Sequence, residues 1–339
     1  MSKPELTFFT ELSPGDLSEL FKGRFVIDDL QALDAALSLA IIDFSEERAA
    51  VVKRLNEAGI PVIAWLLLPE EEGYWFNTGN YEQAAARYIS FKAWTTEYEL
   101  VWAGIGLDIE VDIHDIKQVM DKEQAEKFLP ILLQRLRDKH QVDRAKKAYQ
   151  ALIDLIHADG YPVESYQIPL ISEERRAKAT VLQRLAGIVD VDTDREVLML
   201  YSSFLRPDGA AVLYSYALEA DSVGVGSTGG GVDIPGVVNT DPLSWEELTR
   251  DLRLCVRQEK PIHIFSLEGC TRQGFLSKLS TIDWDAPVEV PEEIHKIRLI
   301  RTWITAGLWL LERPWVILVS LATLIGLGFL LTRKKRKNS

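Results

Sequence analysis

The stretch "VWAGIGLDIE", residues 101–110, is apolar for most of its length and ends in two carboxylates. This pattern predicts a buried strand whose last residues leave the core, and a segment rich in helix-forming residues follows it. Seven more runs of this kind, each followed by a helical or polar segment, occupy residues 6–12, 37–44, 60–68, 161–170, 196–204, 221–227 and 261–269. Eight strands alternating with helices predict an α/β fold, a closed (β/α)8 TIM barrel.

Helix signals occur between the predicted strands. Ser45 precedes two glutamates and Gly59 follows the apolar periodicity, which predicts a helix between them. Residues 125–160 are long enough for two helices, and Pro130 is a candidate for the break. A doubly wound open sheet is the alternative fold, but no GxGxxG motif follows the first strand to support it.

The C-terminal part differs from the barrel in composition. We expect the barrel to occupy residues 1–285, followed by a linker and an interfacial amphipathic segment over 286–313. Residues 314–332 carry no charge, and 19 residues at 1.5 Å per residue span roughly the 30 Å of a bilayer core. The sequence therefore predicts a single-pass membrane protein, with the lipid bilayer as a partner and a basic tail over 333–339. The N-terminus shows no export leader, which favours the cytoplasmic side for the barrel.

Charge and cysteine content exclude several classes of function. Residues 296–339 hold nine Lys or Arg and one acid, so the other 295 residues hold 29 basic and 50 acidic groups. A body of that charge repels phosphate backbones and argues against nucleic acid as a partner. Cys255 and Cys270 belong to no CxxC or Cys/His pattern, so we expect two buried thiols, no metal site and no cofactor.

The acidic end of the stretch 101–110 is the candidate catalytic site. Side chains alternate along a strand, so Asp108 and Glu110 share one face at the end where barrel enzymes hold their active sites. Two neighbouring carboxyls repel one another, which favours keeping one of them protonated near neutral pH. A protonated carboxylic acid at this position is suited to general acid catalysis.

These residues resemble a motif of the chitinase-type glycoside hydrolases, family eighteen. That family carries DGxDxDxE at the end of strand four, where this chain has "AGIGLDIE", and MxYD on strand six, where this chain has "MLYS". The resemblance implies hydrolysis of a carbohydrate, with Glu110 as general acid and Asp108 orienting a substrate acetamido group. It also implies that the Tyr201 hydroxyl steadies the substrate carbonyl.

The chain departs from the family pattern at several positions. Ala103 and Gly106 stand where the family has aspartates, Ser202 replaces the acid after the tyrosine, and Phe265 stands near the position of a strand-eight tryptophan. These losses leave open a catalytically inactive barrel that binds glycans or serves as a scaffold.

A second carboxylate would allow glycoside hydrolysis without the missing aspartates. Glu268 shares a strand face with Ile262, Ile264 and Ser266, so we expect it at the barrel mouth opposite Glu110. Glu11 and Asp43 are further mouth candidates. The expected substrate-binding residues, which combine aromatic, amide and acidic groups near the strand ends, are Tyr74, Trp75, Asn77, Glu164, Tyr166 and Gln167.

Two rival functions remain open from the sequence. The Gly-rich stretch 224–236 follows strand seven, where barrels that use phosphorylated substrates bind the phosphate, which makes a phosphate-ester-binding barrel an alternative. Glu110, Glu164 and Glu268 could instead hold a divalent ion, as carboxylates do in sugar-isomerase barrels. The interpretation that we favour is a membrane-anchored barrel that cleaves a glycosidic bond.

Overall fold

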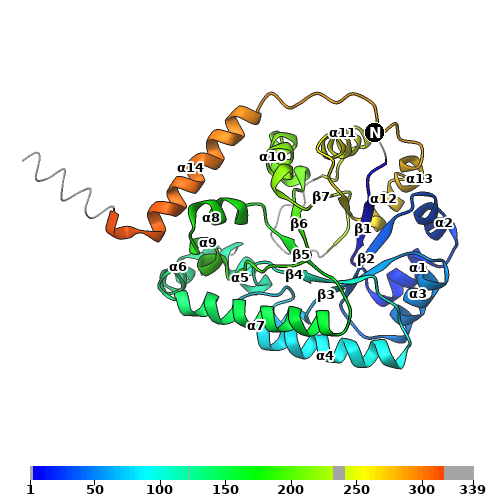
Figure 1. Ribbon diagram of the computed structural model, residues 1–339, viewed down its shortest axis with the longest axis horizontal. Helices are drawn as coiled ribbons and strands as arrows, with labels where there is room; N and C mark the ends of the chain where they lie inside the picture. The colour runs from blue at the N-terminus through cyan, green and yellow to red at the C-terminus, as the bar shows by residue number, and fades with distance from the viewer. Residues whose placement is uncertain (1–2, 121, 232–240, 317–339) are drawn as a thin grey trace, which may run out of the picture.

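The computed structural model describes residues 3–120, 122–231 and 241–316 (Figure 1). Its sheet is a closed barrel in which every strand runs parallel to both neighbours and β8 pairs with β1. The strands are β1 Leu6–Thr10, β2 Ala36–Ile41, β3 Val62–Leu66, β4 Gly104–Asp108, β5 Val163–Gln167, β6 Arg195–Met199, β7 Ser222–Gly226 and β8 Ile262–Phe265. The predicted (β/α)8 barrel is therefore confirmed, with each strand inside its predicted run or one residue beyond it.

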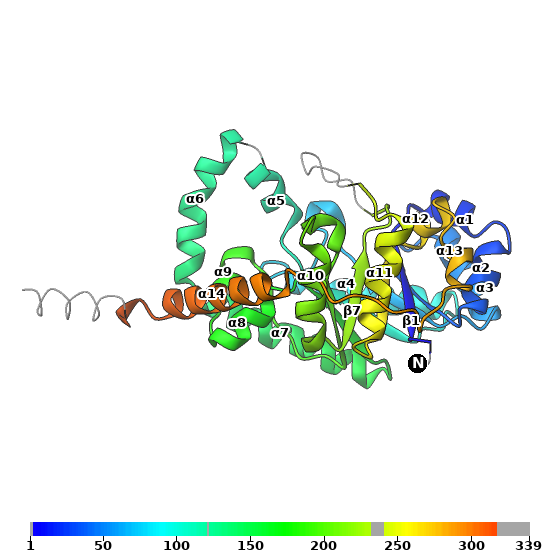
Figure 2. The ribbon, with the colours of Figure 1, turned by 90° about the horizontal axis from the view of Figure 1, so that it is seen from above.

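Helices surround the barrel. They are α1 Pro14–Leu20, α2 Phe25–Ala32, α3 Glu46–Glu57, α4 Tyr81–Glu97, α5 Ile113–Met120, α6 Lys122–Arg137, α7 Lys139–Ala158, α8 Ile171–Ala177, α9 Val181–Ala186, α10 Gly209–Tyr216, α11 Trp245–Val256, α12 Leu267–Arg272, α13 Leu276–Leu279 and α14 Ile294–Glu312. Figure 2 shows α5 and α6 projecting beyond the rest of the barrel.

Local sequence signals explain where several helices begin. The Ser45 side chain accepts a hydrogen bond from the backbone N–H of Arg48 at 3.3 Å and starts α3 as predicted. The break in the long helical segment is not at Pro130, which lies inside α6. It is at Asp138, whose carboxylate accepts the backbone N–H of Gln141 at 3.1 Å and so caps α7. The cap decides the boundary because it satisfies backbone donors that a new helix would otherwise leave unpaired.

The barrel interior is filled by aromatic side chains. The ring of Phe9 on β1 meets those of Trp65 at 5.2 Å and Tyr166 at 4.8 Å, both edge-on. These rings belong to an inner cluster that is distinct from the larger apolar layer between strands and helices. A packed interior leaves the carboxyl ends of the strands as the place where polar groups reach solvent.

Helix α14 packs against α8 and α10 on the outside of the barrel (Figure 1). Arg301 from this helix is buried, donates to Glu173 at 2.6 Å and to Glu219 at 2.5 Å, and lies 3.6 Å from the ring centre of Tyr216. The segment expected to be a linker and interfacial helix therefore contains a helix that is docked to the barrel by buried charges.

The prediction of a single-pass membrane protein is contradicted by the helices that the structure describes. Over residues 3–120, 122–231 and 241–316, none of them combines the length and the apolar character needed to cross a bilayer. The segment 314–332, on which the prediction rested, lies outside the described residues from 317 onward, as does the basic tail.

Candidate active site

Asp108 and Glu110 lie together at the carboxyl end of β4. Asp108 is the last residue of the strand and is paired in register with Tyr166 of β5. Glu110 follows two residues later and is fixed by the loop after β3. The backbone N–H of Phe76 donates to the Asp108 carbonyl at 2.9 Å, and the N–H of Glu110 donates to the Phe76 carbonyl at 3.1 Å. This short parallel bridge holds the Glu110 backbone in place beyond the strand.

The two carboxyls perturb one another. Asp108 is 1% exposed, and its Oδ2 accepts a hydrogen bond from Nε1 of Trp65 at 3.0 Å, while Oδ1 is buried without a donor among the described residues. Burial, followed by the charges of Glu110 and Glu11, raises the pKa of Asp108. Burial also raises the pKa of the partly exposed Glu110 to about 7. The pair therefore retains a proton near neutral pH.

Glu11 and Tyr74 form a second polar unit at the mouth. Glu11 directly follows β1, and its Oε1 accepts a hydrogen bond from the Tyr74 hydroxyl at 2.6 Å. Tyr74 has a left-handed backbone conformation, with φ +64, after Gly73 at φ +102, which turns its ring back toward β1. The charge of Glu11 contributes to the raised pKa of Asp108, so the acidic groups after β1 and β4 share one environment.

Tyr201 follows β6 and lies against the Phe265 ring, with centroids 5.5 Å apart and planes 29° apart. A Cβ at Gly226 would come within 3.2 Å of the Tyr201 ring, so the glycine makes room for it. Burial and the charges of Glu110 and Asp108 raise the pKa of Tyr201, which keeps the hydroxyl protonated. Both rings are partly exposed and form an aromatic wall beside the carboxyls.

Close packing against Tyr166 explains why residue 106 is a glycine. A Cβ there would lie 2.3 Å from the Tyr166 hydroxyl, closer than any real contact. Tyr166 is 1% exposed and its hydroxyl hydrogen-bonds Ser38 at 2.7 Å. Tyr166 thus forms the floor below Asp108 and occupies the space toward which an aspartate at position 106 would project.

Glu268 lies just past the carboxyl end of β8, but it is buried in a helix and not on the strand face that we expected. Strand β8 ends at Phe265, and the residues that face the barrel interior are His263 and Phe265, not the set to which Glu268 was assigned. Glu268 lies in the first turn of α12, buried beside the hydroxyls of Thr10 and Ser266, and burial raises its pKa. Strand alternation cannot be extended past the end of the strand, which is why the expectation failed.

Glu164 lies at the opposite end of the barrel from the mouth. It is the second residue of β5, and its carboxylate meets Nε2 of His263 at 3.2 Å and Nη1 of Arg195 at 3.6 Å. Burial alone would raise the pKa of Glu164, but the charges of His263 and Arg195 outweigh it and hold the pKa low. The expected position of Glu164 at the mouth is therefore wrong, because it enters the barrel at the amino-terminal end of the strand.

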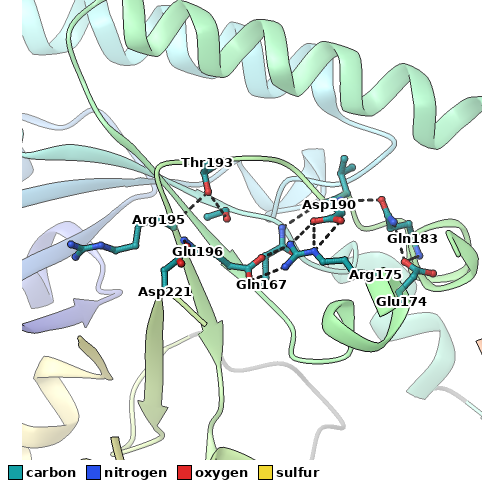
Figure 3. Close-up of polar contacts among 11 residues, drawn as sticks. Gln167, Glu174, Arg175, Gln183, Asp190, Thr193, Arg195, Glu196 and Asp221 are labelled. Atoms are coloured by element: carbon teal, nitrogen blue, oxygen red, sulfur yellow. Dashed lines mark hydrogen bonds and ion pairs between the residues drawn. The ribbon is translucent and has the colours of Figure 1, made fainter. Parts of the chain in front are cut away.

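Gln167 points away from the barrel interior. Its amide donates to the Val189 carbonyl at 3.1 Å, on the outer side where Arg175 pairs with Glu196 (Figure 3). Figure 3 also shows Arg195 and Glu196 leaving β6 on opposite sides. Gln167 is thus part of the layer between strand and helix, and its expected place at the mouth is also wrong.

The remaining predicted binding residues organise the loop after β3. Asn77 is 4% exposed, its Oδ1 accepts the Gly79 N–H at 2.8 Å, and its amide donates to the Trp75 carbonyl at 3.3 Å. Trp75 is 7% exposed and its ring meets that of Tyr74 edge-on at 5.2 Å. The Tyr74 hydroxyl donates to Glu11, and the Asn77 amide also donates to Oδ2 of Asp112 at 3.4 Å.

In the part of the chain that the structure describes, we find no site suited to a phosphate ester or to a divalent ion. Three carboxylates gather at the mouth, which disfavours a phosphorylated substrate, and the Gly-rich stretch lies outside the described residues from 232 onward. Glu110, Glu164 and Glu268 are not brought together, and among the described residues no three His, Cys, Asp or Glu side chains are arranged so that they could hold one metal ion.

Comparison with known proteins assigns this chain to no family. No known family and no curated protein matches this sequence. The chain is similar to the PgaB (BpsB) glycoside hydrolase domain from Bordetella bronchiseptica, at 10% identity, TM-score 0.45, and coverage of 82% of this chain and 98% of that one. It is similar to an L-ribulose 3-epimerase at 10% identity, TM-score 0.42, and coverage of 93% and 98%. It is also similar to a putative aldo-keto reductase from Pseudomonas aeruginosa at 9% identity, TM-score 0.41, and coverage of 82% and 91%. Membership of the chitinase-type family is not confirmed, and the barrel assignment rests on the strand pairing.

Proposed function

We propose that the chain hydrolyses glycosidic bonds, with Glu110 protonating the oxygen of the leaving group. The observation that carries this proposal is the Asp108–Glu110 pair at the end of β4, in which the pKa of Glu110 is raised to about 7. A general acid works best when its pKa lies near the working pH, because it then holds its proton and still releases it readily. Ordinary surface glutamates are ionised at neutral pH and cannot serve in this way.

The surrounding groups suit the binding of a sugar. The stacked rings of Tyr201 and Phe265 offer a partly exposed aromatic surface for the apolar face of a sugar ring. The Tyr201 hydroxyl stays protonated and can donate to a substrate oxygen. Asp108, held by Trp65 and two residues before Glu110, shares the proton that the pair retains near neutral pH.

The test is turnover of a panel of β-linked glycans, both N-acetylated and plain, by the full chain and by Glu110→Gln. We expect the wild type to turn over at least one glycan and the variant to lose roughly a hundredfold or more of that rate. Wild-type turnover should fall as the pH rises through about 7, because Glu110 loses its proton there. The matched control is Glu97→Gln, which changes an exposed glutamate at the end of α4.

A second candidate function is a glycan-binding barrel without catalysis. It is favoured by one observation, the Tyr166 side chain that occupies the space at Gly106 where the resembling family carries an aspartate. Binding of a glycan without turnover, equal in the wild type and in Glu110→Gln, would support this function. Cleavage of phosphate esters would contradict both.

A further inference from the structure

We propose that Glu11 is the second carboxylate of this site and acts at the anomeric carbon while Glu110 acts at the leaving group. This inference rests on the proposed glycosidase function and deepens it. The sequence suggested Glu268 for the role, but Glu268 is buried in α12 beside the hydroxyls of Thr10 and Ser266. Glu11, in contrast, is partly exposed at the barrel mouth.

The position of Glu11 matches what the reaction requires. It directly follows β1, which lies three strands from β4 around the ring of eight, so Glu11 and Glu110 come from different walls of one mouth. Glycosidases place two carboxyls on different sides of the bond that breaks. A Cβ built on Gly231 would lie 3.0 Å from Oε2 of Glu11 and 2.4 Å from Cζ of Phe265, so this oxygen lies beside the aromatic wall.

Tyr74 gives Glu11 a fixed orientation. Its hydroxyl donates to Oε1 at 2.6 Å, which helps to hold the carboxylate at a defined place. A hydrogen bond donated to a carboxylate favours its charged form, which is the form that a nucleophile or a base needs. Tyr74 is therefore a positioning residue that acts through Glu11.

The chemistry balances in either of two modes. If Glu11 is the nucleophile, one of its carboxylate oxygens bonds to the anomeric carbon, the bond to the leaving oxygen breaks, and Glu110 gives that oxygen its proton. Water then attacks the anomeric carbon, returns a proton to Glu110 and releases Glu11 with the configuration retained. If Glu11 is the base, it takes a proton from a water that attacks directly, Glu110 again protonates the leaving oxygen, and the configuration inverts.

The test uses full-chain Glu11→Gln, Glu11→Ala and Glu110→Gln on an aryl glycoside of whichever sugar the wild type hydrolyses. With 2,4-dinitrophenolate as leaving group, no proton is needed, so Glu110→Gln should keep most of the bond-cleaving step. Glu11→Gln should lose about a hundredfold or more on this substrate and on the natural glycan alike. Added azide should restore cleavage by Glu11→Ala, forming a glycosyl azide, because azide attacks the anomeric carbon without a base.

Azide rescue is a gain of activity that a misfolded variant cannot show. If the wild type is active and Glu110→Gln fails on the natural glycan, but Glu11→Gln keeps more than about a third of wild-type turnover, the role of Glu11 is overturned and the proposed function stands. Absence of rescue in a folded Glu11→Ala also overturns it. If the wild type cleaves no glycoside, both proposals fall together.

Discussion

Replacement of Glu110 by Gln should stabilise the folded chain at alkaline pH. The ordinary pKa of this group is 4.5 and its folded value is about 7, so the unfolded chain releases the proton first as the pH rises. Folding stability therefore falls between these two values and stays lowered above them. At about 1.4 kcal/mol for each pH unit, less a discount for the exposed part of the side chain, the loss is about 2–3 kcal/mol. Removing the charge of Glu110 also takes away one of the charges that raise the pKa of Asp108. This change further stabilises the folded chain at alkaline pH.

The measurement is urea unfolding of the wild type, Glu110→Gln and the exposed control Glu97→Gln at about pH 4.5 and at about pH 8. We expect the stability difference between Glu110→Gln and the wild type to grow by about 2–3 kcal/mol from the lower to the higher pH. The control removes a carboxylate that is exposed and not buried. A difference for Glu110→Gln that stays constant within about 0.5 kcal/mol would refute the argument that burial beside Asp108 raises its pKa. This test needs no substrate, so it holds whatever the barrel binds.

Two further substitutions test the packing. Gly106→Ala would place a methyl group 2.3 Å from the Tyr166 hydroxyl, so urea unfolding should show a loss of about 1–3 kcal/mol, whereas Gly15→Ala, with open space around it, should be close to neutral. A Gly106→Ala variant as stable as the wild type would show that Tyr166 moves freely. Arg301→Met would leave the fully buried Glu173 without its closest cation and should cost about 3 kcal/mol in the same assay, a loss that high salt should not reproduce in the wild type.

The sequence predicted the barrel well because its signals are local. Each strand is a short apolar run bounded by polar residues, and each capping serine lies next to the helix that it starts, so windows of a few residues suffice. The proximity of Asp108 and Glu110 was equally accessible, since a single residue separates them in the sequence, although Glu110 lies beyond the end of β4. The break at Asp138 was missed because proline was weighed above the capping carboxylate.

The rest of the site depends on contacts between distant segments. Glu11 and Tyr74 meet across 63 residues, and Trp65 reaches Asp108 across 43, so no spacing in the sequence encodes either hydrogen bond. Glu164 failed for another reason. The sequence does not distinguish a polar residue at the start of a strand from one at its end, but their side chains lie at opposite ends of the barrel. Register between neighbouring strands, which only the fold supplies, separates the two.

The attachment of α14 limits where the chain can be shortened. A truncation after α13 would keep all eight strands and the carboxyl ends of the barrel. It would also remove Arg301, which pairs with Glu173 and Glu219. Such a fragment would have to hydrate or protonate those carboxyls in order to persist. We therefore expect the smallest stable fragment to extend beyond the barrel itself, and expression boundaries should be drawn on the far side of residue 312.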